Sequence, residues 1–167
     1  MQSKLLVSAA TAAIALLGVG CGSTSPSAAV ASPSPSAAAS PSPLPPTTAA
    51  TIKVATDANL GKILVAGNGL TVYLFVADTG TASTCYTSCA TIWPPVLTAG
   101  APKAGAGAQG SLLGTTARTD GTTEVTYAGH PLYYFIKDKK PGDTTGQGVN
   151  GFGALWWVLT PSGAAMH

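Results

Sequence analysis

The chain has 167 residues, a formal net charge of +2 at pH 7 and only 8% charged residues, while hydrophobic residues make up 46%. A charge this low and balanced excludes a strongly basic surface of the kind that holds nucleic acid, so no nucleic-acid partner is expected. The three cysteines and two histidines leave few candidates for a metal centre or for general acid-base catalysis.

The start of the chain has the pattern of a secretory leader. Lys4 precedes the apolar run LLVSAATAAIALL, which is too short to span a bilayer comfortably, and the small residues GVG follow. Cys21 comes next, which predicts a lipoprotein: the signal peptide 1–20 is removed and the Cys21 thiol carries a diacylglyceryl group. The usual Leu three positions before the cysteine is Gly18 here. An ordinary cleaved leader with an incidental cysteine is therefore the alternative.

Residues 21–50 read as a linker between this lipidated cysteine and a folded domain. The segment is rich in Ser, Pro and Ala, and it contains no charged residue and no aromatic residue. Such a composition cannot bury enough apolar surface to fold, and its Ser-Pro alternation favours extended, semi-rigid conformers. We expect a disordered tether that holds residues 51–167 at the outer face of the cell membrane.

Short strands bounded by Gly, Asn and Asp are predicted in the first half of this domain. TIKVAT at 51–56 alternates between apolar and polar residues, and KILVA at 62–66 is a short apolar run. The GNG turn at 67–69 joins KILVA to LTVYLFVA, which predicts a hairpin. STCYTSCAT at 83–91 is the one segment that could form a helical turn.

The second half carries a similar series of strands. SLLGTTAR and TTEVTYAG flank Asp120-Gly121, a strong hairpin signal because this pair tolerates positive φ. AGHP then turns the chain into LYYFI. Each half closes on an aromatic-led return segment, WPPVLT at 93–98 and WWVLTP at 156–161.

One ten-residue sequence pattern occurs twice, as GLTVYLFVAD at 69–78 and as GHPLYYFIKD at 129–138. Repeat one then spans about 60–98 and repeat two about 112–161, each with a hairpin, a loop and a return strand. One such unit exposes an apolar face, whereas two facing each other bury both. The sequence therefore predicts a single all-β domain, 51–167, built from two pseudo-symmetric repeats with about seven or eight strands.

The repeated motif pairs three residue types between the two copies. The residues in register are Tyr73 with Tyr133, Phe75 with Phe135, and Asp78 with Asp138. Tyr and Phe two positions apart share one face of a strand and are interpreted as core. Asp, five residues after Tyr, is expected on the other side at the strand's end, where it fixes a turn. The alternative is a pair of carboxylates that meet at a shared site.

Together with STCYTSCATIWPP and RTDGTTEVTYAGHPLYYFIKDKKPGDTTGQG, this motif resembles the bacterial secreted-repeat lipoproteins defined by Tyr-x-(Phe/Trp/Tyr)-x-x-Asp. The resemblance covers nearly all of the predicted domain. It implies an extracytoplasmic lipoprotein. It carries over no catalytic residues, because none is assigned in that family, whose biochemical role is not established.

The cysteine pair in the first repeat has two interpretations. Cys85 and Cys89 form CYTSC in a segment expected to be exported, where a disulfide is the usual outcome. The same spacing occurs in copper chaperones, in which two thiolates and a distant histidine hold the metal. Redox chemistry or Cu(I) binding through Cys85, Cys89 and His130 is therefore the alternative, since thiolates select Cu(I). No other cofactor is expected.

Two further groups of residues are weaker candidates for ligand binding. Trp93, Trp156 and Trp157 could stack on sugars, although adjacent Trp156 and Trp157 face opposite sides of a strand and core use is the simpler interpretation. The oxygen donors of DKKPGDTTGQG could hold Ca²⁺, but their spacing matches no EF-hand loop. These donors are Asp138, Asp143, Thr144, Thr145 and Gln147.

No nucleophile elbow, zinc-protease helix or other catalytic constellation occurs in the sequence. We therefore expect a non-enzymatic envelope module anchored to the membrane through Cys21, with an envelope protein or a wall polymer as its partner. Redox or copper handling is the competing hypothesis.

Overall fold

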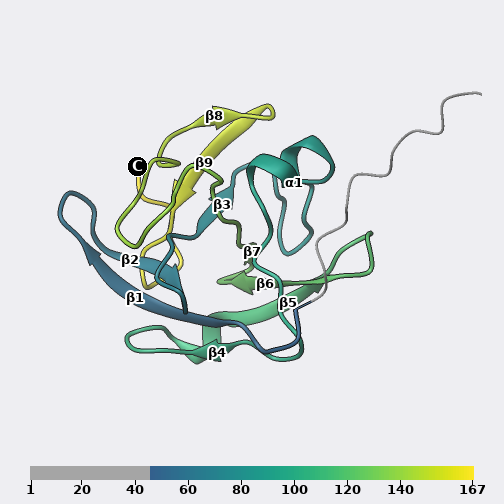
Figure 1. Cartoon of the computed structure of the whole chain (residues 1–167), viewed down its shortest axis with the longest axis horizontal. Coiled ribbons are helices and arrows are strands. Elements are labelled where there is room, and N and C mark those ends of the chain that lie inside the picture. The colour runs from purple at the N-terminus through teal and green to yellow at the C-terminus, as the bar shows by residue number, and fades with distance from the viewer. Residues whose placement is uncertain (1–45) are drawn as a thin grey trace, which may run out of the picture. The chain divides into compact units, whose positions relative to one another are not determined.

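The computed structural model describes residues 46–167, so the predicted leader, Cys21 and most of the predicted linker lie outside the described residues. Within 46–167 the chain forms nine short strands, one short α-helix and one 3-10 turn, Gly110–Leu112 (Figure 1). This is the predicted all-β domain, with slightly more strands than expected. The elements are β1 (Thr51–Asp57), β2 (Gly61–Ala66), β3 (Tyr73–Phe75), α1 (Ser88–Ile92), β4 (Lys103–Ala104), β5 (Leu113–Ala117), β6 (Thr123–Tyr127), β7 (His130–Pro131), β8 (Asn150–Gly151) and β9 (Ala154–Val158).

Each half contributes one regular hairpin. β1 pairs antiparallel with β2, and β5 pairs antiparallel with β6, with Thr115 opposite Val125. The predicted turn at Asp120-Gly121 is confirmed: the Arg118 N–H donates to the Thr122 carbonyl at 2.9 Å, and Gly121 has φ 82°. β-Branched residues and small turn residues place these hairpins where the sequence expects them.

The predicted hairpin between KILVA and LTVYLFVA forms only at its turn. The Ala66 N–H donates to the Leu70 carbonyl at 2.9 Å, and a single bridge joins Val65 to Thr71. The chain then leaves β2, whose free edge bonds to the segment after β9, with the Leu64 N–H donating to Leu159 at 3.0 Å. The segment after β9, which belongs to the second half, therefore takes the place along β2 that LTVYLFVA was predicted to take.

The two halves exchange their return segments. β3 pairs antiparallel with β9, so the first motif pairs with the second return segment. Reciprocally, Tyr133 bridges to Pro95, and the Tyr134 N–H donates to the Pro94 carbonyl at 2.8 Å. Pro94 and Pro95 have no N–H to give to a ladder, which explains why these segments make isolated bridges instead of a regular strand pair. The repeats are interlocked rather than placed face to face.

The interior holds two hydrophobic clusters. One gathers the aromatic motif residues and the cysteines: Ile63, Val65, Tyr73, Phe75, Cys85, Cys89, Trp93, Tyr133, Phe135, Trp156 and Val158. The other is largely aliphatic: Ile52, Leu64, Ala66, Val72, Leu74, Val96, Val125, Tyr127, Leu132 and Leu159. Among the described residues, no helix has the length and apolar character needed to cross a membrane.

Candidate functional site

The two copies of the motif meet at the centre of the domain. The Tyr73 N–H donates to the Tyr133 carbonyl and the Tyr133 N–H donates to the Tyr73 carbonyl, both at 2.9 Å. Each phenol then reaches the carboxylate of the other copy. The Tyr73 hydroxyl donates to Asp138 Oδ2 at 2.5 Å, and the Tyr133 hydroxyl donates to Asp78 Oδ2 at 2.6 Å. The motif is repeated because each copy completes the other.

The second oxygen of each aspartate fixes the loop that follows it. Asp78 Oδ1 accepts from the Thr84 N–H at 2.7 Å and from the Thr84 hydroxyl at 2.6 Å. Asp138 Oδ1 accepts from the corresponding groups of Thr145 at 3.0 and 2.5 Å. The predicted role of these aspartates in fixing turns therefore applies to one oxygen of each carboxylate, while the other oxygen bonds a tyrosine. The expected placement on the opposite side from the tyrosines is wrong, because the chain turns after Phe75 and Phe135 and brings the carboxylates back inside.

Burial holds both phenols in the protonated form. The pKa of Tyr73 is raised, first by burial and then by its hydrogen bond to Asp138. The pKa of Tyr133 is raised by burial, by the charge of Glu124 and by its hydrogen bond to Asp78. Two protonated phenols that donate to carboxylates form a stable hydrogen-bonded frame, and neither is poised to release a proton near neutral pH.

The aromatic residues of the motif and the return segments form one continuous stack. Phe75 stacks on Trp156, Trp156 on Trp93, and Trp93 on Phe135, with ring centroids 4.1, 4.0 and 4.1 Å apart. Tyr73 and Tyr133 pack edge-on against Trp93 and Trp156. The stack crosses from one repeat to the other three times, and all six rings are buried. Trp93 and Trp156 therefore offer no face to a sugar, so the stacking hypothesis is wrong for these two residues.

A buried Arg–Glu pair, which the sequence did not predict, lies beside the second tyrosine. Arg118 and Glu124 have fully buried side chains, and Arg118 Nη1 donates to Glu124 Oε2 at 2.6 Å. The same guanidinium bonds Asp120, the Ser83 hydroxyl and the Cys85 carbonyl. The only sequence signal was two opposite charges on adjacent predicted strands, which is far too common to indicate burial.

Glu124, the acidic residue of this pair, has a raised pKa and an incomplete set of hydrogen bonds. Burial raises the pKa of Glu124 to about 8, an effect that Arg118 opposes and the nearby Asp78 charge reinforces. Among the described residues, Glu124 Oε1 is the buried side-chain polar atom without a hydrogen-bond partner. A carboxyl that is buried and half satisfied favours its neutral form.

Cys85 and Cys89 form a disulfide, as the exported context predicted. The bridge encloses the start of α1, and both cysteines belong to the aromatic cluster. His130 lies on β7, and no group of three His, Cys, Asp or Glu side chains within 46–167 is arranged to hold a metal ion. Copper or redox handling through Cys85, Cys89 and His130 would require reduction of the disulfide first, and it stays a prediction.

The oxygen donors of the DKKPGDTTGQG loop are engaged within the chain. Asp138 holds Thr145, as described above. Asp143 accepts from the N–H groups of Lys139 and Lys140 and from the Lys140 ammonium. Gln147 accepts from the Val158 N–H at 2.9 Å. These bonds account for the clustering of Asp138, Asp143, Thr145 and Gln147, and Ca²⁺ binding there stays a prediction.

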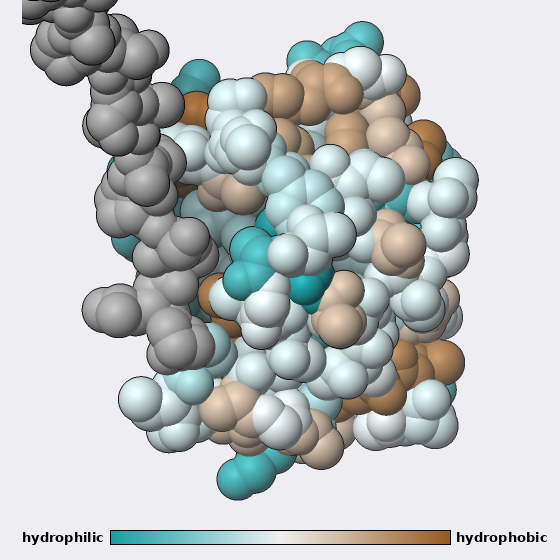
Figure 2. All heavy atoms as spheres, turned by 90° about the vertical axis from the view of Figure 1, so that its right-hand side faces the viewer, coloured by the Kyte–Doolittle hydropathy of each residue, from teal (hydrophilic) through white to brown (hydrophobic). Residues whose placement is uncertain are grey.

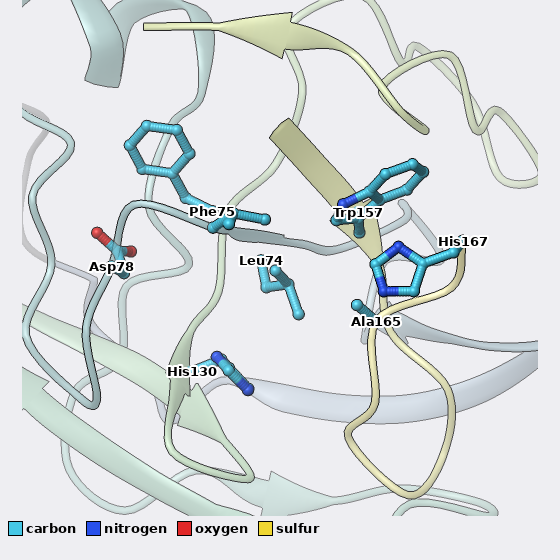
Figure 3. A pocket seen from close by; sticks show the side chains of 8 residues that line it. Leu74, Phe75, Asp78, His130, Trp157, Ala165 and His167 are labelled. Atoms are coloured by element: carbon cyan, nitrogen blue, oxygen red, sulfur yellow. The ribbon is translucent and has the colours of Figure 1, made fainter. Parts of the chain in front are cut away.

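A pocket of about 260 Å³ opens where β3, β7 and β9 approach one another. Its lining is mainly apolar, and two histidines and one carboxylate face it. Figure 3 shows Leu74 near its centre, Asp78 on one side, Trp157 and His167 on the other, and His130 below. Trp157 is half-buried and packs edge-on against the His167 ring, with centroids 4.9 Å apart. Of the three tryptophans, Trp157 is the one that a ligand can reach.

A family model described as a secreted repeat of unknown function matches the chain twice, over residues 54–97 and 114–160. Each match contains one copy of the motif together with the return segment of the same half. The chain belongs to this secreted-repeat family. No curated protein matches the chain, and no solved structure does.

Membership in the secreted-repeat family makes the protein extracytoplasmic. The family match also refines the repeat. It begins at residue 54, inside β1, whereas the repeat read from the sequence began at about residue 60. The equivalent strands are then β1 with β5 and β2 with β6, in agreement with the two hairpins.

Proposed function

We propose that this secreted-repeat protein is a lipoprotein, anchored through Cys21 at the outer face of the membrane, whose β domain is a non-enzymatic binding module. The arrangement of the motif supports this proposal most directly. Its tyrosines and aspartates, the residues that define the sequence pattern, are consumed by hydrogen bonds to each other and to two loops. They build a rigid frame, and neither the tyrosines nor the aspartates of the motif are free to act as an acid, a base or a nucleophile.

The pocket around Leu74 and Trp157 is the ligand site of this module. An apolar floor with an accessible indole and a few polar groups at the rim is the usual composition of a small binding site. His130 and His167 supply the polar groups, since both oxygens of Asp78 are already bonded to Thr84 and Tyr133. Such a pocket suits one sugar ring of a wall polymer or one apolar side chain of an envelope protein.

The anchor is tested by feeding cells an alkyne-labelled fatty acid and detecting label on the protein. Label is expected on the parent and not on Cys21→Ser, which should also move from the membrane fraction to the soluble fraction. Label that persists in Cys21→Ser, or a parent without label, contradicts the anchor.

The binding site is tested by cosedimentation of the purified protein with cell-wall polymer. Trp157→Ala should lower the bound fraction about tenfold, because it removes the accessible indole. Thr56→Ala is the matched control, since Thr56 lines a different concavity, near Asn68 and Pro141. Equal loss in both variants, or no loss in Trp157→Ala, contradicts the site. Turnover of a substrate by the purified protein would contradict the non-enzymatic role.

A further inference from the structure

One exposed residue has a backbone conformation that is unfavourable for its residue type. Among the described residues, Thr87, Ala128 and Phe152 are the non-glycine residues with positive φ. Thr87 lies inside the loop closed by the disulfide, and Ala128 packs directly against Gly163. Phe152 has φ 58° and is 49% exposed. The first two conformations follow from their surroundings, whereas that of Phe152 has no such explanation.

Phe152 occupies the tip of a tight turn. Gly151 pairs with Ala154, so Phe152 and Gly153 form a two-residue connection between β8 and β9 with φ values of 58° and 92°. Turns of this kind favour Asn, Asp or Gly at their first position, because those residues tolerate positive φ. A bulky aromatic residue is strained there. An exposed aromatic kept in an unfavourable conformation indicates a role outside the fold.

Two other exposed side chains accompany Phe152. The exposed large hydrophobic residues of the described chain are Val76, Phe152, Leu155 and Ile136. Val76 donates its N–H to the Leu155 carbonyl at 3.0 Å, and Leu155 pairs with Asn150 beside the turn. We call Val76, Phe152 and Leu155 the apolar corner.

The apolar corner carries no exposed charge nearby in sequence, because Asp78, two residues after Val76, is buried with both carboxylate oxygens hydrogen-bonded. Residues 74–77 and 148–157 contain no Lys, Arg, Asp or Glu. Figure 1 shows the β8–β9 turn at the upper edge of the domain, and Figure 2 shows hydrophobic atoms near that upper end. A partner for this surface therefore needs to be apolar and needs to offer no charge.

We infer that the apolar corner inserts into the interfacial region of a lipid bilayer and so fixes the orientation of the domain on the membrane. Three side chains at one corner are far too few for a protein interface, which buries about 800 Å² on each partner. A bilayer requires no matching surface, and aromatic residues favour its interface. A weak insertion also suffices when a lipid anchor already holds the chain.

This inference rests on the proposed lipid anchor at Cys21, which has to hold the domain close enough to the bilayer for the apolar corner to touch it. The segment from Cys21 to Pro46 spans at most about 75 Å in the extended conformation that its composition predicts, at about 3.1 Å per residue. The domain therefore stays within reach of the membrane that holds its anchor.

The inference is tested with the chain from residue 21 onward carrying Cys21→Ser, so that no acyl chain contributes, by flotation with uncharged phosphatidylcholine vesicles. The parent sequence should float with the vesicles, with a partition coefficient that changes less than about twofold between low and high salt. Phe152→Asn should lower this coefficient about five- to tenfold, because it removes the most exposed large side chain of the turn. Its unfolding temperature should not fall, since Asn tolerates positive φ.

Ile136→Asn is the matched control, because Ile136 is similarly exposed but follows the other motif, beside Lys137. Its partition coefficient should stay within about twofold of the parent value. The inference is overturned if the parent fails to float, if Phe152→Asn floats like the parent, or if Ile136→Asn loses as much as Phe152→Asn. Because the assay contains no acylated protein, its failure leaves the separate labelling test of Cys21 unaffected.

Discussion

At the scale of single residues, the tyrosine and aspartate of each motif serve the opposite copy. Tyr73 bonds Asp138 and Tyr133 bonds Asp78, so no motif is complete by itself. This pairing favours a structural frame over a site in which the two carboxylates meet, because each carboxylate has a tyrosine and a threonine as its partners. Three predictions at this scale follow from the contacts of individual side chains.

The crossed hydrogen bonds predict a specific energetic coupling. Tyr73→Phe and Asp138→Asn should be coupled by about 1 to 3 kcal/mol in a double-mutant cycle of unfolding free energies, because they remove the same buried bond to a charged group. Tyr73→Phe combined with Asp78→Asn, which lies in the same motif, is the control and should be additive within about 0.5 kcal/mol. Coupling within a motif and not between motifs would show that the pairing is wrong.

Truncation of the outer rings of the aromatic stack should be costly. Phe75→Ala and Phe135→Ala each remove a buried ring that stacks on a tryptophan, so each should lower the unfolding free energy by about 3 to 5 kcal/mol. Urea unfolding followed by circular dichroism measures the loss. Variants that melt like the parent would mean that these rings are not core anchors.

Glu124 predicts a pH dependence of stability. Its pKa is raised from 4.5 to about 8 by burial, so the folded chain binds a proton that the unfolded chain releases. The resulting stability is fully present below about pH 4.5 and is lost as the pH rises through about 8. Arg118, Asp78 and Ser83 are the groups that face it.

The comparison that isolates this effect is the parent against Glu124→Gln, which stays neutral. Between about pH 5 and about pH 8 the unfolding free energy of the parent should fall relative to that of Glu124→Gln. A parent that gains stability relative to the variant over this range would mean that Glu124 is ionised in the fold as the partner of Arg118.

At the scale of elements, α1 and its disulfide hold one end of the Arg118 network. Cys85 supplies a carbonyl to the guanidinium at 2.8 Å, and the bridge closes a loop four residues along the chain. The five-residue helix is too short to be stable by itself, so the covalent bond and the aromatic cluster keep it in place.

Removal of this bridge should therefore cost a moderate amount of stability. Cys85→Ala combined with Cys89→Ala should lower the unfolding free energy by about 2 kcal/mol, the chain-entropy value for so short a loop. Urea unfolding of the variant and of the reduced parent should agree, since both lack the same constraint. A variant as stable as the oxidised parent contradicts this.

At the scale of the whole molecule, the exchanged return segments make the domain one cooperative unit. β3 depends on β9, and the second motif depends on Pro94 and Pro95. Each half forms its own hairpin, but neither half contains the partner of its own motif segment. The pseudo-symmetry therefore creates one folding unit rather than two small domains.

This interlocking predicts the behaviour of separated halves. Residues 46–98 and residues 112–167, produced separately, should each be unfolded by circular dichroism, because each lacks the segment that pairs with its motif and half of the shared aromatic cluster. The whole chain should unfold in a single transition, with coincident tryptophan fluorescence and circular dichroism curves. A cooperative transition in either isolated half would contradict the interlocked fold.

The sequence by itself determined the elements that depend on local chemistry. Asp120-Gly121 predicted the β5–β6 hairpin because a type of turn with positive φ requires such residues. The repeated Tyr, Phe and Asp predicted the pseudo-symmetry, and the export pattern predicted the Cys85–Cys89 bridge. The turn and the bridge each depend on residues a few positions apart, and the pseudo-symmetry is visible because each copy of the motif is itself local.

Only the tertiary structure decided which segments pair across the domain. The hydrogen bond of Tyr73 with Asp138, the pairing of β3 with β9, and the buried Arg118–Glu124 pair join residues from different segments. Periodicity indicates that a side chain is buried but not which strand covers it, because several apolar strands compete for the same edge. The burial of Arg118 and Glu124 and the exposure of Phe152 depend on which strands pair. The candidate site is therefore visible only in the folded chain.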